Sequence, residues 1–325
     1  LQLINIDDGT VQNIDLDAND ETRFEAQLDT LLPYLEDRRL AKKRLDRLEI
    51  KPAFNQLRPG QSELKQRLKT ASLESKCILL EAPTGFGKTG IALEHALQSM
   101  QSGEYQRCIY LTSKSTGQWQ AVQQIQSMAG TNLRYIQMRN RKEHRINTPA
   151  HTCTADNRCD HQSAGILENS GIYPPELFSN GTFSVEQARQ TGAQTGLCPY
   201  SLTRACLPFA EIWVGDSNYI FAPASRPVFC SAAGVDPSTT LLIVDEAHNL
   251  SDRTANALST EIRSTDLHFA LDGLREAGAS RQLLATGYEL INCIDSINTT
   301  GALHSNDHYN LLDLTQDFHR TLSKE

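Results

Sequence analysis

The sequence has no long hydrophobic run and no excess of basic charge. No stretch of about 18 apolar residues occurs, which is the length that a membrane-spanning helix needs, and no signal-peptide pattern opens the chain. We therefore expect no contact with a membrane. The formal net charge of −8 gives no general reason to bind nucleic acid, so a nucleic-acid site would have to be a local basic patch.

Two segments concentrate basic residues, at 38–51 and at 134–145. The basic side chains of the first segment fall around a helix, which favours a solvated surface over an anion site. For the second segment, a solvated surface and an anion site remain equal alternatives. The chain starts at Leu1 and ends on a charged segment without a natural stop, so we expect it to be a fragment of a longer protein.

The eight cysteines come without a secretion signal, which argues for reduced thiols or metal ligands rather than disulfides. Cys77 and Cys108 lie in apolar strand patterns, and we expect them in the core. Cys230 and Cys293 have no partner nearby in the sequence, and we expect them to be inert.

The other four cysteines lie in an irregular segment, 140–210, that interrupts a regular alternation of strands and helices. They are Cys153, Cys159, Cys198 and Cys206. Four thiolates on one metal centre would hold such a segment together, and both zinc and an iron–sulphur cluster fit four cysteines. The spacing is not that of a standard zinc ribbon, so metal ligands and free thiols remain equal alternatives on the residues alone.

The stretch 79–90 predicts a phosphate-binding loop between a strand and a helix. The apolar run 77–80 is typical of a short buried strand, a turn rich in glycine and proline follows, and a helical pattern starts at Ile91. Glycines let backbone N–H groups close around an anion, and the helix N-terminus adds partial positive charge. Lys88 would reach the outer phosphates, and Thr89 would ligate Mg²⁺. Ala82 stands where the usual pattern has glycine. The residues expected to hold the nucleotide phosphates are Ala82, Pro83, Thr84, Gly85, Phe86, Gly87, Lys88 and Thr89.

A second motif, Asp245-Glu246-Ala247-His248, follows the apolar run 241–244. That run predicts a buried parallel strand, and ligands of open α/β sheets bind at the carboxyl ends of such strands. Asp245 would hold Mg²⁺ through its water shell, and Glu246 would orient and deprotonate an attacking water. Together with the loop, this motif predicts that the chain binds and hydrolyses a nucleoside triphosphate.

The remaining patterns place further candidates around these two motifs. Gln61, in Arg58-Pro59-Gly60-Gln61, can read an adenine edge because its amide both donates and accepts. Strands are expected at 107–112, 133–138 and 210–215, and small hydroxyls with Lys114 follow the first of them. We also expect a hairpin followed by a helix at 21–48 in the opening residues, and mainly helices after Asn249.

Five stretches in this order resemble the iron–sulphur helicases of superfamily two, the group of the xeroderma pigmentosum group D and bacterial DinG helicases. They are Arg-Pro-Gly-Gln, Glu-Ala-Pro-Thr-Gly-Phe-Gly-Lys-Thr, Tyr-Leu-Thr-Ser-Lys-Ser, Cys-Pro-Tyr leading to Ala-Glu-Ile-Trp-Val-Gly-Asp-Ser-Asn-Tyr-Ile-Phe, and Val-Asp-Glu-Ala-His-Asn-Leu. The resemblance implies an α/β fold, a RecA-like parallel sheet with a P-loop, an inserted iron–sulphur cluster domain and the start of a helical arch domain.

The resemblance also implies a division into five segments. These are an N-terminal tail with a connecting helix (1–54), the first part of the RecA-like lobe (55–139), the cysteine-rich cluster insertion (140–209), the second part of the lobe with the DEAH box (210–250), and a helical arch-like segment (251–325). The opening residues look like the tail of a nuclease-like module that precedes some bacterial members.

By resemblance, the activity is that of an ATP-dependent 5′-to-3′ DNA helicase acting in DNA repair on single-stranded or forked DNA. The implied cofactors are ATP, Mg²⁺ and a [4Fe–4S] cluster. Carried over by position, Gln61 contacts adenine, and Lys88, Asp245 and Glu246 are catalytic. The implied DNA contacts are Thr112, Ser113, Lys114, Arg139, Arg141 and Lys142.

The family pattern is not met in full. Cys198 matches the last cluster ligand, but Glu143-His144-Arg145 stand where the first ligand cysteine is usual. The cluster would have to use Cys153, Cys159 and Cys198 plus a fourth group, which is either Cys206 or a histidine such as His151 or His161.

The family's second motor lobe, with its arginine fingers, is not in these residues. We therefore expect the chain by itself to bind ATP weakly and to hydrolyse it poorly. The alternatives are a DNA translocase, an RNA helicase, or a non-catalytic DNA-binding scaffold that keeps the P-loop fold. A bacterial-type, cytoplasmic and nucleoid-associated protein is expected, with protein partners unknown.

Overall fold

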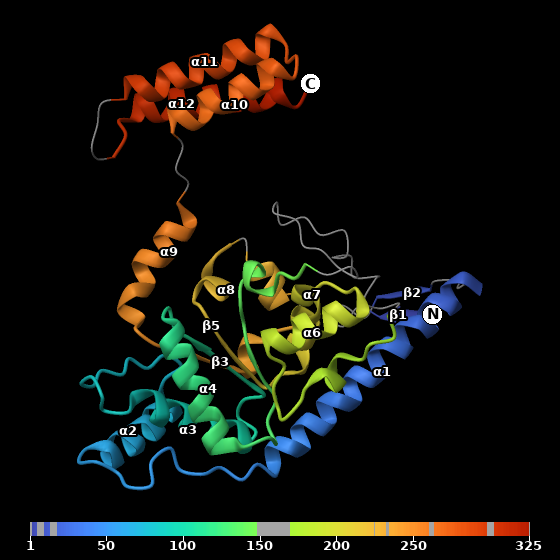
Figure 1. Cartoon of the computed structure of the whole chain (residues 1–325), viewed down its shortest axis with the longest axis vertical. Coiled ribbons are helices and arrows are strands. Elements are labelled where there is room, and N and C mark those ends of the chain that lie inside the picture. Colours follow the sequence, from blue (N-terminus) through green and yellow to red (C-terminus); the bar gives the residue numbers. More distant parts are fainter. Residues whose placement is uncertain are drawn as a thin grey trace. The chain divides into compact units, whose positions relative to one another are not determined.

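A computed structural model describes residues 2–4, 10–13, 18–147, 170–223, 225–231, 234–259, 263–297 and 302–324. The chain divides into two compact units, Leu1–Ala257 and Leu258–Glu325. Figure 1 shows a layered α/β structure in the first unit and a group of helices in the second. Within the described ranges, no helix combines the length and the apolar character that crossing a membrane requires.

The first unit is built on a four-stranded sheet in the order β4-β5-β3-β6. Its strands are β3 (Arg107–Leu111), β4 (Tyr135–Gln137), β5 (Ile212–Gly215) and β6 (Thr240–Val244). Every neighbouring pair is parallel, which puts the carboxyl ends of all four strands at one edge. This confirms the predicted parallel α/β sheet and its strands at 107–112, 133–138 and 210–215.

Helices cover both faces of the sheet, because successive residues of β3 point alternately to two apolar cores. Cys108 and Tyr110 face a core that contains residues of α1 (Ala18–Asp46), α3 (Lys88–Gln101) and α4 (Ser115–Ala129). Ile109 and Leu111 face a second core with residues of α6 (Val185–Thr195) and α7 (Pro199–Cys206). Figure 1 shows α3 and α4 on one side of the strands and α6 and α7 on the other.

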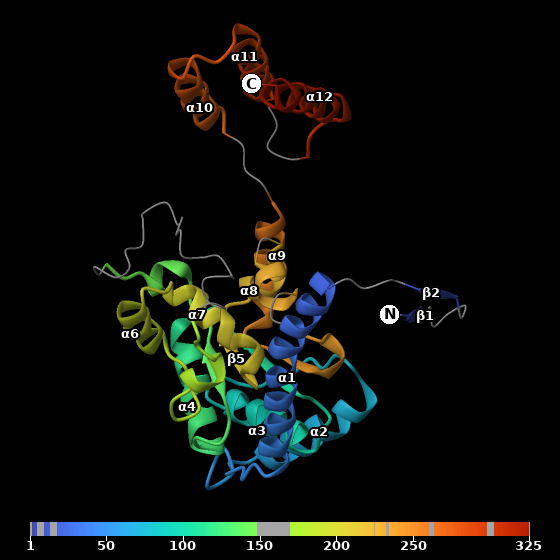
Figure 2. The same ribbon diagram turned by 90° about the vertical axis from the view of Figure 1, so that its right-hand side faces the viewer.

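The opening residues form the predicted hairpin and long helix. Strands β1 (Gln2–Ile4) and β2 (Val11–Asn13) pair antiparallel, and α1 follows them (Figure 2). Two ion pairs fasten α1 to the sheet unit: Arg44 to the fully buried Glu211 at 2.8 Å, and Asp37 to Arg134 at 2.7 Å. Part of the basic segment 38–51 therefore serves the fold, since a buried carboxylate needs a charged partner.

The apolar run 77–80 does not join the sheet, so the strand predicted there is wrong. Leu79 is 91% exposed, and Cys77 is exposed rather than in the core. The Ser75 hydroxyl donates to the Cys77 carbonyl at 2.8 Å and accepts the Cys77 N–H at 3.3 Å. Such local side-chain hydrogen bonds compete with the backbone hydrogen bonds of a strand. A run of four apolar residues indicates only that the segment is hydrophobic, not which strand it would pair with.

Strand β6 is half-buried rather than buried as predicted. It lies at one end of the sheet order and pairs with β3 alone among the described strands. Leu242 is 40% exposed for this reason. By contrast, Cys108 of β3 is fully buried, and burial raises the pKa of its thiol to about 12, as expected of a core residue.

Short elements connect the main ones and complete the first unit. They are α2 (Gln61–Glu74), α8 (Asn218–Phe221), α9 (Leu250–Leu258), η1 (Arg141–His144), η3 (Pro174–Leu177), η4 (Leu207–Phe209), η5 (Pro227–Ser231), η6 (Pro237–Thr239) and η7 (Ala247–Asn249). Element α9 ends at the first residue of the second unit.

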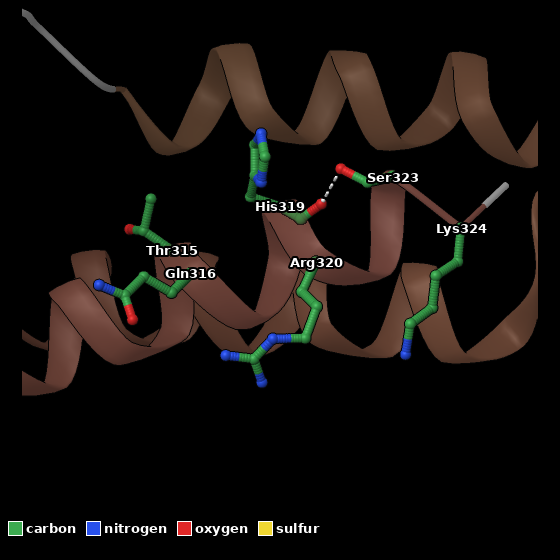
Figure 3. Close-up of a pocket in the computed structure, with 6 residues that line it drawn as sticks. All are labelled: Thr315, Gln316, His319, Arg320, Ser323 and Lys324. Atoms are coloured by element: carbon green, nitrogen blue, oxygen red, sulfur yellow. Dashed lines mark hydrogen bonds between the residues drawn. The ribbon is translucent and has the colours of Figure 1, made fainter.

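The second unit is helical, as predicted for the residues after Asn249. It contains α10 (Ser264–Glu276), α11 (Arg281–Ser296) and α12 (Ser305–Leu322). A Cβ on Gly287 of α11 would lie 2.5 Å from Leu271 of α10, so glycine allows these helices to pack closely. Figure 3 shows a hollow beside the end of α12, where the Ser323 hydroxyl donates to the carbonyl of His319 at 2.8 Å.

Candidate nucleotide-binding site

The loop before α3 has the backbone that an anion-binding loop needs. Gly85 and Gly87 have φ of 75° and 92°, a region that side chains with a Cβ rarely adopt. A Cβ on Gly87 would also lie 2.6 Å from the Phe54 ring and 3.0 Å from the Gln61 amide nitrogen. Helix α3 begins at Lys88 directly after this turn, so its unpaired N–H groups and partial positive charge lie at the loop.

A turn upstream of α2 braces this loop. The buried Gln61 accepts the Arg58 N–H through Oε1 at 2.8 Å and donates through Nε2 to the Phe86 carbonyl at 2.6 Å. Arg58 adds a bond from Nη1 to the Gly85 carbonyl at 2.8 Å. This bracing role was missed, since nothing in the sequence links residues so far apart. The predicted adenine contact of Gln61 stays a prediction.

Lys88 folds back over its own loop. Its Nζ donates to the Ala82 carbonyl at 2.5 Å and to the Pro83 carbonyl at 3.3 Å. An ammonium group carries three donors and no acceptor, so these carbonyls hold it in place while leaving a donor for an incoming phosphate oxygen. Neutral carbonyls are weaker partners than a phosphate, because bonds between two charged groups are shorter and stronger.

The two sequence motifs meet at one cavity of about 550 Å³. Its lining includes Lys88 and Thr89 from the start of α3, and Asp245 and Glu246 from the end of β6. Asp245 extends the ladder, because its N–H donates to the Leu111 carbonyl at 2.8 Å. An ammonium, a hydroxyl and two carboxylates therefore face the same space, which suits a triphosphate with its metal ion.

Glu246 has an unusual backbone and two basic residues as neighbours. Its φ of 53° is left-handed, which costs on the order of 1–3 kcal/mol for a residue with a side chain and is common at functional sites. Its carboxylate lies 3.9 Å from the Lys114 ammonium and 3.5 Å from Nδ1 of His248. The side chain is 41% exposed, so water reaches it.

A family model, DEAD_2, matches residues 49–267, which is more than half of the chain and includes both motifs. The chain belongs to the DEAD_2 family. This finding confirms the resemblance to helicases of the xeroderma pigmentosum group D type.

Relatives of this DEAD_2 chain include two named helicases. "General transcription and DNA repair factor IIH helicase subunit XPD" of Arabidopsis thaliana is 26% identical over 294 residues, which cover 80% of this chain and 36% of that protein. "Regulator of telomere elongation helicase 1 homolog" of Aedes aegypti is 32% identical over 98 residues, 30% of this chain and 9% of that protein. These two relatives are eukaryotic and give no support to the expected bacterial, nucleoid-associated protein.

A solved structure described as XPD helicase shares the fold. The TM-score is 0.52 at 16% identity, over 83% of this chain and 48% of that one. The DEAD_2 chain thus spans less than half the length of the proteins named here.

The predicted DNA contacts of the DEAD_2 chain differ in accessibility. Thr112 is 2% exposed, and its side chain lies against Gly117, while its predicted contact with DNA stays a prediction. Lys114, in contrast, has 68% of its side chain exposed. Arg139 pairs with Glu143 at 3.4 Å and keeps 26% of its side chain exposed.

Two further predicted DNA contacts, Arg141 and Lys142, lie in η1. The guanidinium of Arg141 lies over the Tyr200 ring, 4.9 Å from its centroid, while Lys142 is exposed. Stacking on an aromatic face orients a guanidinium without consuming its donors.

The cysteine prediction lies partly outside the described residues, since Cys153 and Cys159 belong to 148–169. Cys198 and Cys206 are both buried and flank α7, at its N-cap and its last residue. Eight residues of helix separate their Cα atoms by about 12 Å. No group of three potential metal ligands occurs in the part of the chain that is described.

Cys206 has the surroundings of a core thiol. It lies in the apolar core and donates its S–H to the Pro174 carbonyl at 3.6 Å. Burial raises the pKa of this thiol well above its usual range, as for a core residue. These observations do not fit Cys206 as the fourth ligand.

His144 stands where the family usually places its first ligand, and here it has a structural role. It is 1% exposed, with Nδ1 2.9 Å from the Asn140 carbonyl and Nε2 3.0 Å from the Thr203 hydroxyl. Burial lowers the pKa of His144, so the imidazole is held neutral. It joins η1 to α7 through hydrogen bonds.

Proposed function

We propose that this chain is the first motor lobe of an ATP-dependent DNA helicase. The observation that carries the proposal is the single cavity lined by Lys88, Thr89, Asp245 and Glu246. These residues come from two motifs far apart in the sequence, and a purely structural fold has no need to bring all four together. Membership of DEAD_2 and the helicase names of the relatives support the same activity.

The donor set of the cavity fits MgATP. A hydroxyl and carboxylates are the oxygen ligands that Mg²⁺ takes together with phosphate oxygens, and the ion would neutralise charge on the phosphates. Lys88 binds the outer phosphates, and the N–H groups of the loop surround them. Asp245 and Thr89 would hold the Mg²⁺ ion at the phosphates. Glu246 would orient the attacking water and accept its proton.

DNA would be sensed next to the nucleotide. Lys114 follows β3, is exposed, and lies 3.9 Å from the Glu246 carboxylate. A phosphate of bound DNA would draw the ammonium away, because a phosphate competes well for an exposed cation in a weak pair. Glu246 would then be free to act on water. We infer that this contact couples DNA binding to hydrolysis.

A [4Fe–4S] cluster is proposed for the cysteine-rich insertion, with Cys153, Cys159 and Cys198 as ligands. The family resemblance supports the group, and Cys198, at the N-cap of α7, matches the last cluster ligand of that pattern. The fourth ligand would be a histidine such as His151 or His161, since Cys206 has the setting of a core residue.

Unwinding with 5′-to-3′ polarity is proposed, in a DNA-repair process. The test is strand displacement by the full-length protein on DNA and RNA duplexes with a 5′ or a 3′ tail. We expect ATP-dependent displacement of DNA with a 5′ tail, and its loss in Lys88→Ala. Displacement from a 3′ tail would overturn the polarity, and displacement of RNA alone would overturn the substrate. Normal activity of Lys88→Ala would overturn the proposed site.

A further inference from the structure

Tyr110 lies beneath the nucleotide cavity, at the centre of the sheet. It belongs to β3 and pairs in register with Val214 of β5 and Ile243 of β6. The alternation of the strand turns its side chain toward α3, and the residue is 1% exposed. Its hydroxyl oxygen lies 3.4 Å from the hydroxyl oxygen of Thr89, in the first turn of α3.

A carboxylate that faces the cavity lies near the same hydroxyl. β6 runs beside β3 and ends just before Asp245, and the charge of the Asp245 carboxylate acts on the Tyr110 side chain. Burial, with a smaller contribution from this carboxylate, raises the pKa of Tyr110, so the hydroxyl keeps its proton. Tyr110, Thr89 and Asp245 all line the cavity.

We propose that Tyr110 is a positioning residue that orients the Thr89 hydroxyl, beside the Asp245 carboxylate, to receive one Mg²⁺. The inference rests on the proposed ATP-dependent function, because these two side chains are the metal-side ligands proposed there.

The Tyr110 hydroxyl donates to the Thr89 oxygen and uses one lone pair of that oxygen. The other lone pair is left for a cation in the cavity that both residues line. The hydroxyl of Tyr110 thus sets the orientation of the Thr89 side chain.

A phenylalanine would fill the same core without this function. The ring of Tyr110 packs in the apolar core, and a buried hydroxyl costs free energy unless it is hydrogen-bonded. The chain offers a matched control in Tyr135 of β4, which is also 1% exposed and faces the same core. Its hydroxyl oxygen lies 2.5 Å from the Gln126 amide nitrogen and not at the cavity.

The test compares Tyr110→Phe with Tyr135→Phe in the full chain. Binding of a fluorescent ADP analogue is measured over a range of Mg²⁺ concentrations and in EDTA, and thermal unfolding is followed in parallel. We expect Tyr110→Phe to raise the Mg²⁺ concentration for half-maximal binding by about threefold to tenfold, because the hydrogen bond that orients Thr89 is lost. Binding in EDTA should change less than about twofold, and Tyr135→Phe should match the unmodified chain in both conditions.

The outcomes separate this inference from the function on which it rests. An unchanged Mg²⁺ dependence in Tyr110→Phe would overturn the positioning role while the nucleotide site stands. Equal weakening with and without Mg²⁺ would also overturn it, since it would show a general structural effect. Failure of the unmodified chain to bind the ADP analogue in any condition would overturn the proposed function itself.

Discussion

Replacing Gly87 by alanine tests whether the loop geometry is what makes the nucleotide site. Gly87 has a φ of 92°, and an added Cβ would lie 2.6 Å from the Phe54 ring. The backbone strain costs on the order of 1–3 kcal/mol, and displacing a packed ring costs about 1–3 kcal/mol more. The loop must move to relieve both, and it carries the Phe86 carbonyl that Gln61 holds.

The matched control is Gly103→Ala. Gly103 has a similar φ of 81°, but an added Cβ meets nothing within 4 Å, so only the backbone strain applies. For a domain of about 250 residues, each kcal/mol lowers the melting temperature by about 2–4 °C. We expect Gly103→Ala to lose about 3 °C and Gly87→Ala at least about twice as much.

The assay is thermal unfolding with and without MgADP. Gly103→Ala should keep the stabilisation by nucleotide, and Gly87→Ala should lose it, because binding to the native state is what raises the melting temperature. Adding Phe54→Ala to Gly87→Ala removes the clash. The double variant should therefore lose less stability than the sum of the losses in the two single variants. Equal decreases in melting temperature in the two glycine variants, with nucleotide binding kept in both, would refute the reasoning.

Three further predictions concern the cluster, the DNA contact and pH. Cys198→Ala should lose bound iron while Cys206→Ala keeps it, measured as iron content of the anaerobically purified protein, and equal loss would restore Cys206 as a ligand. Lys114→Ala should leave the DNA-free ATPase rate of the full-length protein nearly unchanged, because an exposed pair contributes about 0–1 kcal/mol, but it should lower the DNA-stimulated rate. Lys69→Ala, on the exposed face of α2, serves as control, and an unchanged DNA response in Lys114→Ala would contradict the coupling. Burial lowers the pKa of both His95 and His144 below 6.5, so the unfolded chain takes up protons first as the pH falls. Stability should therefore decrease from pH 7 to below 6.5, less steeply in His144→Gln, and an identical slope by urea unfolding would count against this.

Local sequence patterns predicted much of the first unit, because apolar residues recur along its strands and helices at the spacing that buries them. Strand β3 is one example: its apolar residues are buried on both faces, as in a parallel sheet. The two motifs at Lys88 and Asp245 were predicted to meet because parallel strands share one carboxyl edge, and they line the same cavity.

The sequence could not supply contacts that depend on which segments become neighbours. Nothing local shows that Gln61 bonds the Phe86 carbonyl, or that the Tyr110 hydroxyl lies against Thr89. The run 77–80 was predicted as a strand from hydrophobicity alone, but Cys77 in this run hydrogen-bonds the Ser75 hydroxyl instead of a neighbouring strand. Likewise, nothing local shows that the Thr112 side chain packs against Gly117.

The central claim is that Lys88, Thr89, Asp245 and Glu246 surround one hydrolysable nucleotide. The most direct measurement is the ATPase rate of the full-length protein on single-stranded DNA, with MgADP affinity measured beside it, for the unmodified protein, Glu246→Gln and the exposed control Glu25→Gln. We expect Glu246→Gln to bind MgADP normally and to lose at least about a hundredfold in rate, as for a missing general base. Glu25→Gln should behave as the unmodified protein. An ATPase rate in Glu246→Gln equal to that of the unmodified protein would contradict the claim.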